Sequence, residues 1–246
     1  GARGLSTTEV KPLKVAIEGN IASGKSTLLE LLRHDFRLVT VPEPVAQWQN
    51  VPSEGGNETG GNMLELFYQD PHRWAYTFQS YAFLSRLQAQ LKPQPKWAGE
   101  QPLDFVVYER SVFSDRNIFG LNCRDMGLFN DVEWHIYNDW HKWLVSSFDV
   151  RLDAVIYLRT KPEVCMKRLT SRKRAEEKTV SLDYLRALHG RHESWFFPAE
   201  GEPDWCGAVP PKMLVLDGDE EFEKDEVRRK HMMEEIRSFV DSSLRG

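Results

Sequence analysis

The stretch from Lys14 to Leu32 joins an apolar segment, a glycine-rich loop and a second apolar segment. Its pattern predicts a buried strand over residues 14–18 and a helix over residues 27–32. The connecting sequence, GNIASGKS, fits the spacing G-x-x-x-x-G-K-[ST], in which backbone amides surround phosphate oxygens at a helix N-terminus. A chance match in a glycine turn is the alternative, but the flanking strand and helix favour a phosphate-binding loop.

This loop gives different tasks to its residues. Lys25 is expected to bridge the β- and γ-phosphates of a nucleotide, and the hydroxyl of Ser26 to hold Mg²⁺. The glycines let the backbone approach phosphate oxygens without a Cβ in the way. The other nucleotide contacts predicted in this loop are Gly19, Asn20, Ala22, Ser23, Gly24 and Thr27.

The length of 246 residues and the 41% share of hydrophobic residues predict a single domain over residues 1–246. No run approaches the roughly 18 apolar residues of a membrane span, so we expect no membrane partner. The net charge of −5 argues against nucleic acid as a partner, because duplex binding usually needs a basic face. The three cysteines lie far apart without a C-x-x-C pair, which favours free thiols in a reducing compartment over a zinc site.

Four further apolar segments predict strands that alternate with helices, at residues 37–42, 103–108, 154–158 and 213–216. This order is typical of an α/β fold with a five-stranded parallel sheet flanked by helices on both faces, the P-loop kinase architecture. Ligands bind such sheets beyond the carboxyl ends of the strands, where Glu43 and Glu109 follow the second and third strands. Both carboxylates are expected beside the phosphate loop, and Glu109 is expected to assist Mg²⁺. Taken alone, Glu43 has the alternative of an ordinary surface carboxylate.

Two polar residues stand out in the helix predicted over residues 74–91. Gln79 and Arg86 lie seven apart on an otherwise apolar face, with Ala82 between them. They are either exposed or recognise a ligand in a pocket, and the spacing alone favours exposure. The remaining segments are predicted as helices over 63–68, 112–119, 133–148, 162–169, 181–197 and a terminal stretch to Leu244, with a mobile loop over 50–62.

The segment RLTSRKRAEEK, residues 168–178, carries a dense run of charges. Such a run is usually a solvated face, and composition alone favours that interpretation. A mobile arginine cluster is also what a phosphoryl-transfer lid needs, and this alternative predicts a helical lid over about residues 168–180.

Five motifs occur in order along the chain: GNIASGKS, PEPVAQW, YTFQSYAFLSR, YERSVFSDR and RLTSRKRAEEK. Together they resemble the eukaryotic deoxyribonucleoside kinases, most closely the deoxycytidine and deoxyguanosine kinase branch. The resemblance covers essentially the whole chain. It implies transfer of the γ-phosphate of ATP or UTP, with Mg²⁺, to the 5′-hydroxyl of a deoxynucleoside in nucleotide salvage.

The resemblance also implies the roles of individual residues at the reacting centre. Glu43 would be the general base for the sugar 5′-hydroxyl, and Arg110 would hold this base in place. Glu109 would support Mg²⁺ together with Ser26. The lid arginines would be Arg172 and Arg174, with Arg168 nearby, and the loop from Asp217 to Phe222, including Glu221, would hold the donor's base.

For the nucleoside, the resemblance implies that Tyr68 and Glu177 grip the 3′-hydroxyl and that Gln79 bonds the edge of the base. The apolar walls of the nucleoside site would be Ile21, Trp48, Leu64, Phe67, Phe78 and Phe119.

The choice of base depends on Arg86 and Asp115, which match the charged pair of that branch. A carboxylate accepts from the exocyclic amine of cytosine or adenine, whereas thymine presents a carbonyl and a methyl group. We expect deoxycytidine first, deoxyadenosine and deoxyguanosine as further substrates, and thymidine as a poor one. Ala82 is the residue that the resemblance implies for a preference for deoxycytidine. The segment EWHIYNDWH is more similar to deoxyguanosine kinase, so a purine-preferring enzyme stays open as the alternative.

Other classes of protein fit these motifs less well. A regulatory GTPase needs N/T-K-x-D, and the nearest string, from Thr160 to Glu163, ends in glutamate. A nucleoside monophosphate kinase needs a basic pocket for the acceptor phosphate, which the predicted aromatic wall does not supply. A binding module without activity would not need Lys25, Glu43 and Arg110 together.

The family further implies a homodimer packed through helices, for which the aromatic segment 133–148 is a candidate surface. Residues 1–13 are predicted to be a flexible N-terminus, either a disordered tail or the remainder of a transit peptide. The expected compartment is the cytoplasm or nucleus, and the mitochondrial matrix stays open as an alternative.

Overall fold

The computed structural model describes residues 12–53, 59–93, 103–172 and 175–244. Its main sheet has five strands in the order β2-β5-β1-β6-β7, and every neighbouring pair is parallel. The strands are β1 (Leu13–Glu18), β2 (Leu38–Val41), β5 (Phe105–Glu109), β6 (Ala154–Arg159) and β7 (Lys212–Asp217). These are the five strands that the sequence predicts, and the α/β class is confirmed.

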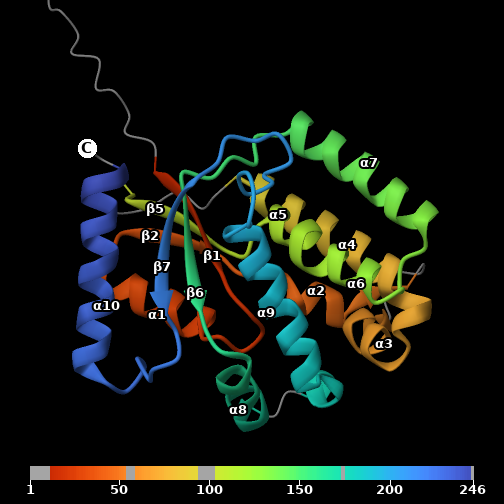
Figure 1. Ribbon diagram of the computed structural model, residues 1–246, viewed down its shortest axis with the longest axis horizontal. Coiled ribbons are helices and arrows are strands. Elements are labelled where there is room, and N and C mark those ends of the chain that lie inside the picture. The colour runs from red at the N-terminus through yellow and green to blue at the C-terminus, as the bar shows by residue number, and fades with distance from the viewer. Residues whose placement is uncertain (1–11, 54–58, 94–102, 173–174, 245–246) are drawn as a thin grey trace, which may run out of the picture.

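Side chains alternate between the two faces of this sheet, and each face packs against its own helices. Val15, Ile17 and Ile156 contact a core built with α1 (Lys25–Asp35) and α10 (Glu226–Phe239). Ala16 and Tyr157 point the other way, into a core shared with α4 (Pro71–Leu91) and α9 (Leu182–Phe196). Figure 1 shows the two helical layers on opposite sides of the sheet.

Strand register sets the position of the acidic residues at the sheet edge. Ile17 pairs with Glu109, so β1 and β5 end at the same level. The phosphate-binding loop therefore leaves β1 directly beside the end of β5, and α1 begins at Lys25 after this loop.

The predicted helix over residues 112–119 is wrong in detail. The structure has α5 (Val112–Ser114), a π-helix η1 (Asp115–Gly120) and then α6 (Leu121–Asp125). A π-helix closes hydrogen bonds over five residues rather than four, and such turns are frequent at functional sites. Apolar periodicity over so short a stretch does not distinguish the two kinds of turn.

The predicted loop over residues 50–62 also needs correction at its ends. Val51–Pro52 (β3) and Thr59–Gly61 (β4) form a short antiparallel pair. A Cβ at Gly60 would lie 3.0 Å from the carbonyl oxygen of Pro52, so glycine allows the two backbones to approach.

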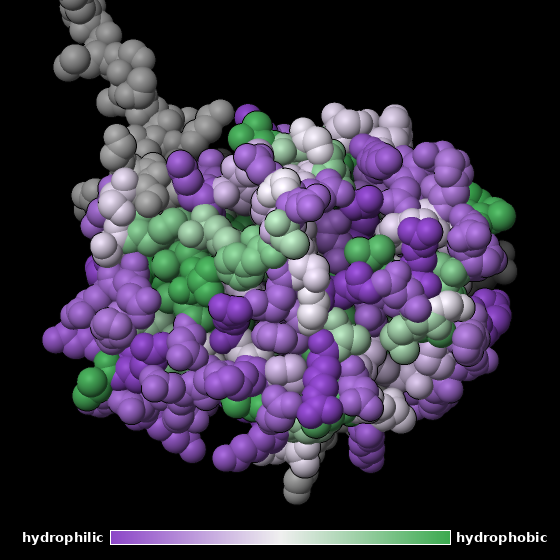
Figure 2. Space-filling model, in the orientation of Figure 1, coloured by the Kyte–Doolittle hydropathy of each residue, from purple (hydrophilic) through white to green (hydrophobic). Residues whose placement is uncertain are grey.

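The other helices are α2 (Val45–Gln49), α3 (Met63–Gln69), α7 (Asp131–Ser147), α8 (Pro162–Arg172), the 3₁₀-helix η2 (Ala175–Thr179) and the π-helix η3 (Val240–Leu244). None of the helices within the described ranges combines the length and apolar character that a membrane span requires. Hydrophilic side chains cover most of the face drawn in Figure 2. An apolar patch lies over the edge strand β7.

Candidate active site

A cavity of about 860 Å³ opens beside the phosphate-binding loop. It brings together side chains from the loop, from the ends of β2 and β5, and from α2, α3, α4, η1, α8 and η2. The predicted site residues that line it are Ile21, Ala22, Gly24, Lys25, Ser26, Thr27, Glu43, Trp48, Leu64, Phe67, Tyr68, Phe78, Gln79, Ala82, Arg86, Glu109, Arg110, Asp115, Phe119, Arg168, Arg172, Glu177, Glu221 and Phe222. Gly19, Asn20 and Ser23 lie behind this lining, and Arg174 lies outside the described residues.

The loop encloses the start of α1 tightly. Gly24 caps the helix at φ 106°, and a Cβ there would lie 2.8 Å from the ring of Phe222, so glycine is required on both counts. Lys25 is buried and donates through Nζ to the Asn20 carbonyl at 2.8 Å. Burial and the nearby Arg110 guanidinium lower the pKa of Lys25 to about 8, and a bound anionic phosphate would raise this pKa again.

Two oxygen ligands of the kind that Mg²⁺ prefers meet at the mouth of the loop. The hydroxyl of Ser26 donates to Oε1 of Glu109 at 3.0 Å. Because a hard cation binds through hydroxyl and carboxylate oxygens, these two residues fit a magnesium site next to the phosphate loop.

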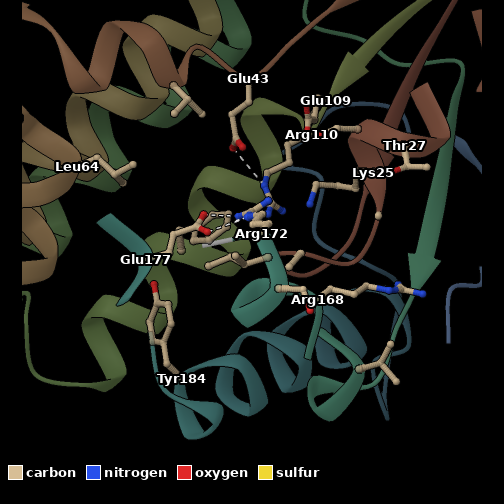
Figure 3. A pocket seen from close by; sticks show the side chains of 18 of the residues that line it. Lys25, Thr27, Glu43, Leu64, Glu109, Arg110, Arg168, Arg172, Glu177 and Tyr184 are labelled. Carbon is tan, nitrogen blue, oxygen red and sulfur yellow. Dashed lines mark hydrogen bonds and ion pairs between the residues drawn. The ribbon is translucent and has the colours of Figure 1, made fainter. Parts of the chain in front are cut away.

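Glu43 points into the cavity from the end of β2, where Figure 3 shows its carboxylate directed at Arg110. Its Oε1 accepts from Arg110 Nε at 3.2 Å, and Arg110 Nη1 donates to the Gly19 carbonyl at 2.6 Å. Arg110 itself has φ 64°, an uncommon conformation for a residue with a side chain. Strain of this kind is held by the surrounding structure and concentrates at functional sites.

Arg86 uses its whole guanidinium group inside the site. Nε donates to Asp115 at 2.9 Å, Nη1 to the Glu109 carbonyl at 3.0 Å, and Nη2 to Glu43 at 2.8 Å. Burial alone would raise the pKa of Glu43, but the charges of Arg110 and Arg86 lower it to about 2. Glu43 is therefore ionised throughout the physiological range.

The prediction that Gln79 and Arg86 are exposed, which their spacing alone favoured, is wrong. Only 2% of Gln79 and 5% of Arg86 is accessible. Gln79 lies beside the buried thiol of Cys123. The polar residues on this face of α4 thus point into a pocket instead of toward solvent.

Aromatic rings form one wall of the cavity. Phe78 stacks on Phe67 with centroids 4.9 Å apart and meets Trp48 edge to face at 5.5 Å. Trp48 is fixed by a hydrogen bond from Nε1 to Ser85 Oγ at 2.8 Å. This apolar wall borders the Arg86–Asp115 pair, because the Arg86 guanidinium lies over the Trp48 ring at 5.7 Å.

Arginines from α8 also line the cavity. Arg172 donates through Nε to Glu177 at 2.9 Å. Burial, and then the nearby charge of Glu177, raise the pKa of Tyr68 above its usual range. Arg168 donates to the carbonyls of Ser23 and Gly218, both at 2.8 Å, and so ties the phosphate loop to the loop after β7.

Some lining residues were not predicted from the sequence, among them Tyr184 on α9, visible in Figure 3 below Glu177. Tyr184 sits in an ordinary amphipathic helix, and no local pattern marks its side chain as facing a ligand. The others are Val45, Val164, Lys167, Ser171, Glu223 and Lys224, whereas Asp219 lies in the predicted donor-base loop.

A parallel sheet with a phosphate loop at its carboxyl edge, and with carboxylate and arginine groups facing that loop, defines a P-loop phosphotransferase. The profile of the deoxynucleoside kinase family matches residues 15–241. The chain belongs to this deoxynucleoside kinase family, and it is a phosphotransferase of nucleotide salvage.

Named relatives align along most of their lengths. Deoxycytidine kinase 2 of Gallus gallus is 43% identical over 242 residues, which cover 93% of this chain and 91% of that protein. Deoxycytidine kinase of Homo sapiens is 39% identical over 244 residues, covering 93% and 91%. The mitochondrial deoxyguanosine kinase of Xenopus laevis is 37% identical over 244 residues, covering 96% and 92%.

Proposed function

We propose that this enzyme transfers the terminal phosphoryl group of ATP or UTP to the 5′-hydroxyl of deoxycytidine, with deoxyadenosine and deoxyguanosine as further substrates. The observation that carries this proposal is the buried pair of Arg86 and Asp115 beside the aromatic wall. Named deoxycytidine kinases among the relatives support the same substrate class.

Base selection follows from hydrogen-bond chemistry at Asp115 and Arg86. The Asp115 carboxylate can accept from an exocyclic amine, and the guanidinium can donate to ring nitrogens and carbonyls. Thymine presents a carbonyl and a methyl group instead of the amine. The Asp115 carboxylate would then lack a donor from the base, and leaving a buried polar group unpaired costs about 1–3 kcal/mol. Gln79 would bond the base edge, and Trp48 and Phe78 would enclose its faces.

Glu43 is proposed as the general base for the 5′-hydroxyl. A primary alcohol is a weak nucleophile, and a positioned carboxylate typically contributes about 10²–10⁴-fold to the rate. Arg110 keeps this carboxylate at the sugar end of the cavity by donating to it while it also holds the Gly19 carbonyl. We propose that Tyr68 and Glu177 fix the 3′-hydroxyl at the far side.

The donor phosphates are proposed to lie in the loop around Lys25, with Ser26 and Glu109 holding Mg²⁺. When bound, the cation supplies charge neutralisation for the phosphate oxygens. Residues 168–180 are proposed as a lid within the single domain, from which Arg168 and Arg172 would complete the cationic surroundings. Arg174 is proposed to act with them, and the loop from Asp217 to Phe222 would hold the donor's base.

A nucleoside monophosphate kinase is the rival within P-loop enzymes, and a purine-preferring deoxyguanosine kinase is the rival within the family. The acceptor wall of Tyr68, Phe67 and Phe78 suits an uncharged nucleoside better than a phosphate. A steady-state screen of the four deoxynucleosides and deoxycytidine monophosphate separates these functions. Deoxycytidine with the highest kcat/KM supports the proposal, whereas turnover only of the monophosphate, or a preference for deoxyguanosine, would overturn it.

We also propose a homodimer that forms through α4 and α7. These helices pack together through Phe83 and Trp140, whose ring centroids lie 4.9 Å apart, and they expose large apolar side chains. The exposed residues on them are Leu84, Leu91, Val132, Ile136 and Trp143. Light scattering on wild type and Trp143→Glu tests this surface, because a dimer should become a monomer in the variant.

The compartment we propose is the cytoplasm or nucleus. Free thiols at Cys123, Cys165 and Cys206 are consistent with a reducing environment. Localisation of the tagged full-length protein checks this, and accumulation in the mitochondrial matrix would overturn it.

A further inference from the structure

A single residue in the loop between α9 and β7 makes four hydrogen bonds. The Asp204 carboxylate accepts from Arg116 Nη1 through Oδ2 and from the Cys206 amide through Oδ1, both at 2.8 Å. Its main-chain carbonyl accepts from Asn117 Nδ2 at 2.7 Å and from Trp195 Nε1 at 2.9 Å. Asp204 therefore ties its loop to two separate helices.

The loop that carries Asp204 has a firm support of its own. Trp205 is 5% exposed, and its ring meets Phe113 at 5.2 Å and Trp195 at 4.8 Å. Aromatic contacts of this kind stabilise a buried loop beyond the area that they bury. The residue next to Asp204 is thus anchored in the core.

The two partners Arg116 and Asn117 belong to the π-helix η1, and they stand between Asp115 and Phe119. Asp115 and Phe119 line the active-site cavity, whereas Arg116 and Asn117 turn away from it toward Asp204. One side of η1, with Asp115 and Phe119, therefore faces the cavity. The other side, with Arg116 and Asn117, is the structural side that contacts the Asp204 loop.

Further contacts hold the structural side of η1. Arg116 Nε donates to Asn138 of α7 at 2.7 Å, and its Nη1 also donates to Asn117 Oδ1 at 2.7 Å. Asn117 is 5% exposed, so its bond to the Asp204 carbonyl lies in a site that excludes most water. A π-helix has no strong intrinsic preference to form, and contacts such as these select it over an ordinary α-helical turn.

We propose that Asp204 is a positioning residue for nucleoside selection. Its carboxylate, through Arg116, holds η1 in the register that places Asp115 against Arg86 and Phe119 beneath Arg110. Its main-chain carbonyl, which side-chain substitutions keep, holds Asn117. The inference rests on the proposed nucleoside site at Asp115 and Phe119. Its consequence is that a loop 88 residues away from Arg116 along the chain controls how tightly the base and sugar are bound.

The test compares Asp204→Ala with wild type in steady-state assays with deoxycytidine and ATP. The KM for deoxycytidine should rise about tenfold, because a small displacement of contacting groups is costly in a packed site. The KM for ATP should stay within about twofold, since the residues of η1 that line the cavity, Asp115 and Phe119, belong to the proposed nucleoside site. The preference for deoxycytidine over thymidine should fall. An equal rise in both KM values would mean general loosening and would overturn the proposal.

Asp204→Asn serves as the conservative variant if Asp204→Ala does not fold. Its side-chain carbonyl can still accept one hydrogen bond, so its KM for deoxycytidine should lie between those of wild type and the alanine variant. A KM equal to wild type in both variants would contradict the positioning role.

A double-mutant cycle with Arg116→Met tests the route of the effect. If Asp204 acts through Arg116, the double variant should have the same KM for deoxycytidine as Arg116→Met alone. Effects that multiply would show that Asp204 acts by another route, and the proposal would fail.

Asp35→Ala is the matched control, because Asp35 also accepts from one arginine, Arg237, through both its carboxylate and its carbonyl. It lies at the far end of α1, and its KM for deoxycytidine should equal that of wild type. The outcomes separate the two proposals. A wild-type enzyme that does not phosphorylate deoxycytidine refutes the proposed function, whereas an active one with an unaffected Asp204→Ala variant refutes only this inference.

Discussion

Arg86 donates to Glu43 at 2.8 Å while its Nε donates to Asp115 at 2.9 Å, so one guanidinium joins the two carboxylates. In the proposed mechanism, Asp115 selects the base and Glu43 accepts the proton from the sugar. Both ends of the nucleoside site are therefore aligned by a single buried side chain. Any substitution of Arg86 is expected to change selection and turnover together.

The paired substitution Arg86→Met with Asp115→Ala should admit thymidine. Removing both charges together avoids leaving one of them buried without a partner, which would cost several kcal/mol. The ratio of kcat/KM for deoxycytidine to that for thymidine should fall by at least about tenfold. Continued exclusion of thymidine by a folded double variant would refute this account of selectivity.

Lys25→Ala should abolish phosphoryl transfer, since the ammonium group is the cation of the phosphate loop. The expected loss of kcat is at least about 10³-fold, measured with saturating deoxycytidine and radiolabelled ATP. Lys230→Ala, on the exposed face of α10, is the control and should retain wild-type activity. Turnover near wild type in Lys25→Ala would undo the phosphate assignment.

Glu18 at the end of β1 should make the fold less stable at alkaline pH. It is fully buried, its Oε1 accepts from Ser111 at 2.7 Å, and its Oε2 has no partner among the described residues. Burial raises the pKa of this carboxyl from 4.5 to about 7. A raised folded-state pKa favours the protonated form, so stability falls as the pH rises from 4.5 to about 7 and stays low above that.

Glu18→Gln should therefore raise Tm more at about pH 8.5 than at about pH 5, by roughly 5 °C. Glu234→Gln, at an exposed position of α10, should shift Tm equally at both pH values. If the two variants behave alike in thermal unfolding, Glu18 is not held in its neutral form by burial.

The sequence predicts the carboxyl-edge residues well, for a simple physical reason. Parallel strands that are in register end together, so Glu43 and Glu109 had to lie near the phosphate loop once their strands were recognised. Lys25 and Ser26 follow from the loop spacing itself. These residues belong to short local patterns, and local patterns are visible in a sequence.

The features that the sequence did not predict depend on contacts between distant parts of the chain. A spacing of seven places Gln79 and Arg86 on one helical face but does not say whether that face meets solvent or a cavity. Likewise, η1 contacts Asp204 through Arg116 and Asn117, and the sequence of the distant loop that carries Asp204 does not predict these contacts. Such contacts become visible only when the chain has been brought together in three dimensions.

Glu43 is the proton acceptor of the proposed mechanism, and Glu43→Gln tests this role directly. Nucleoside affinity by calorimetry should stay within about threefold, while kcat should fall about 10²–10⁴-fold. Because the pKa of Glu43 is lowered to about 2, the defect should be equally large at about pH 6 and about pH 8. A variant that binds deoxycytidine and turns over within about tenfold of wild type would contradict the central claim.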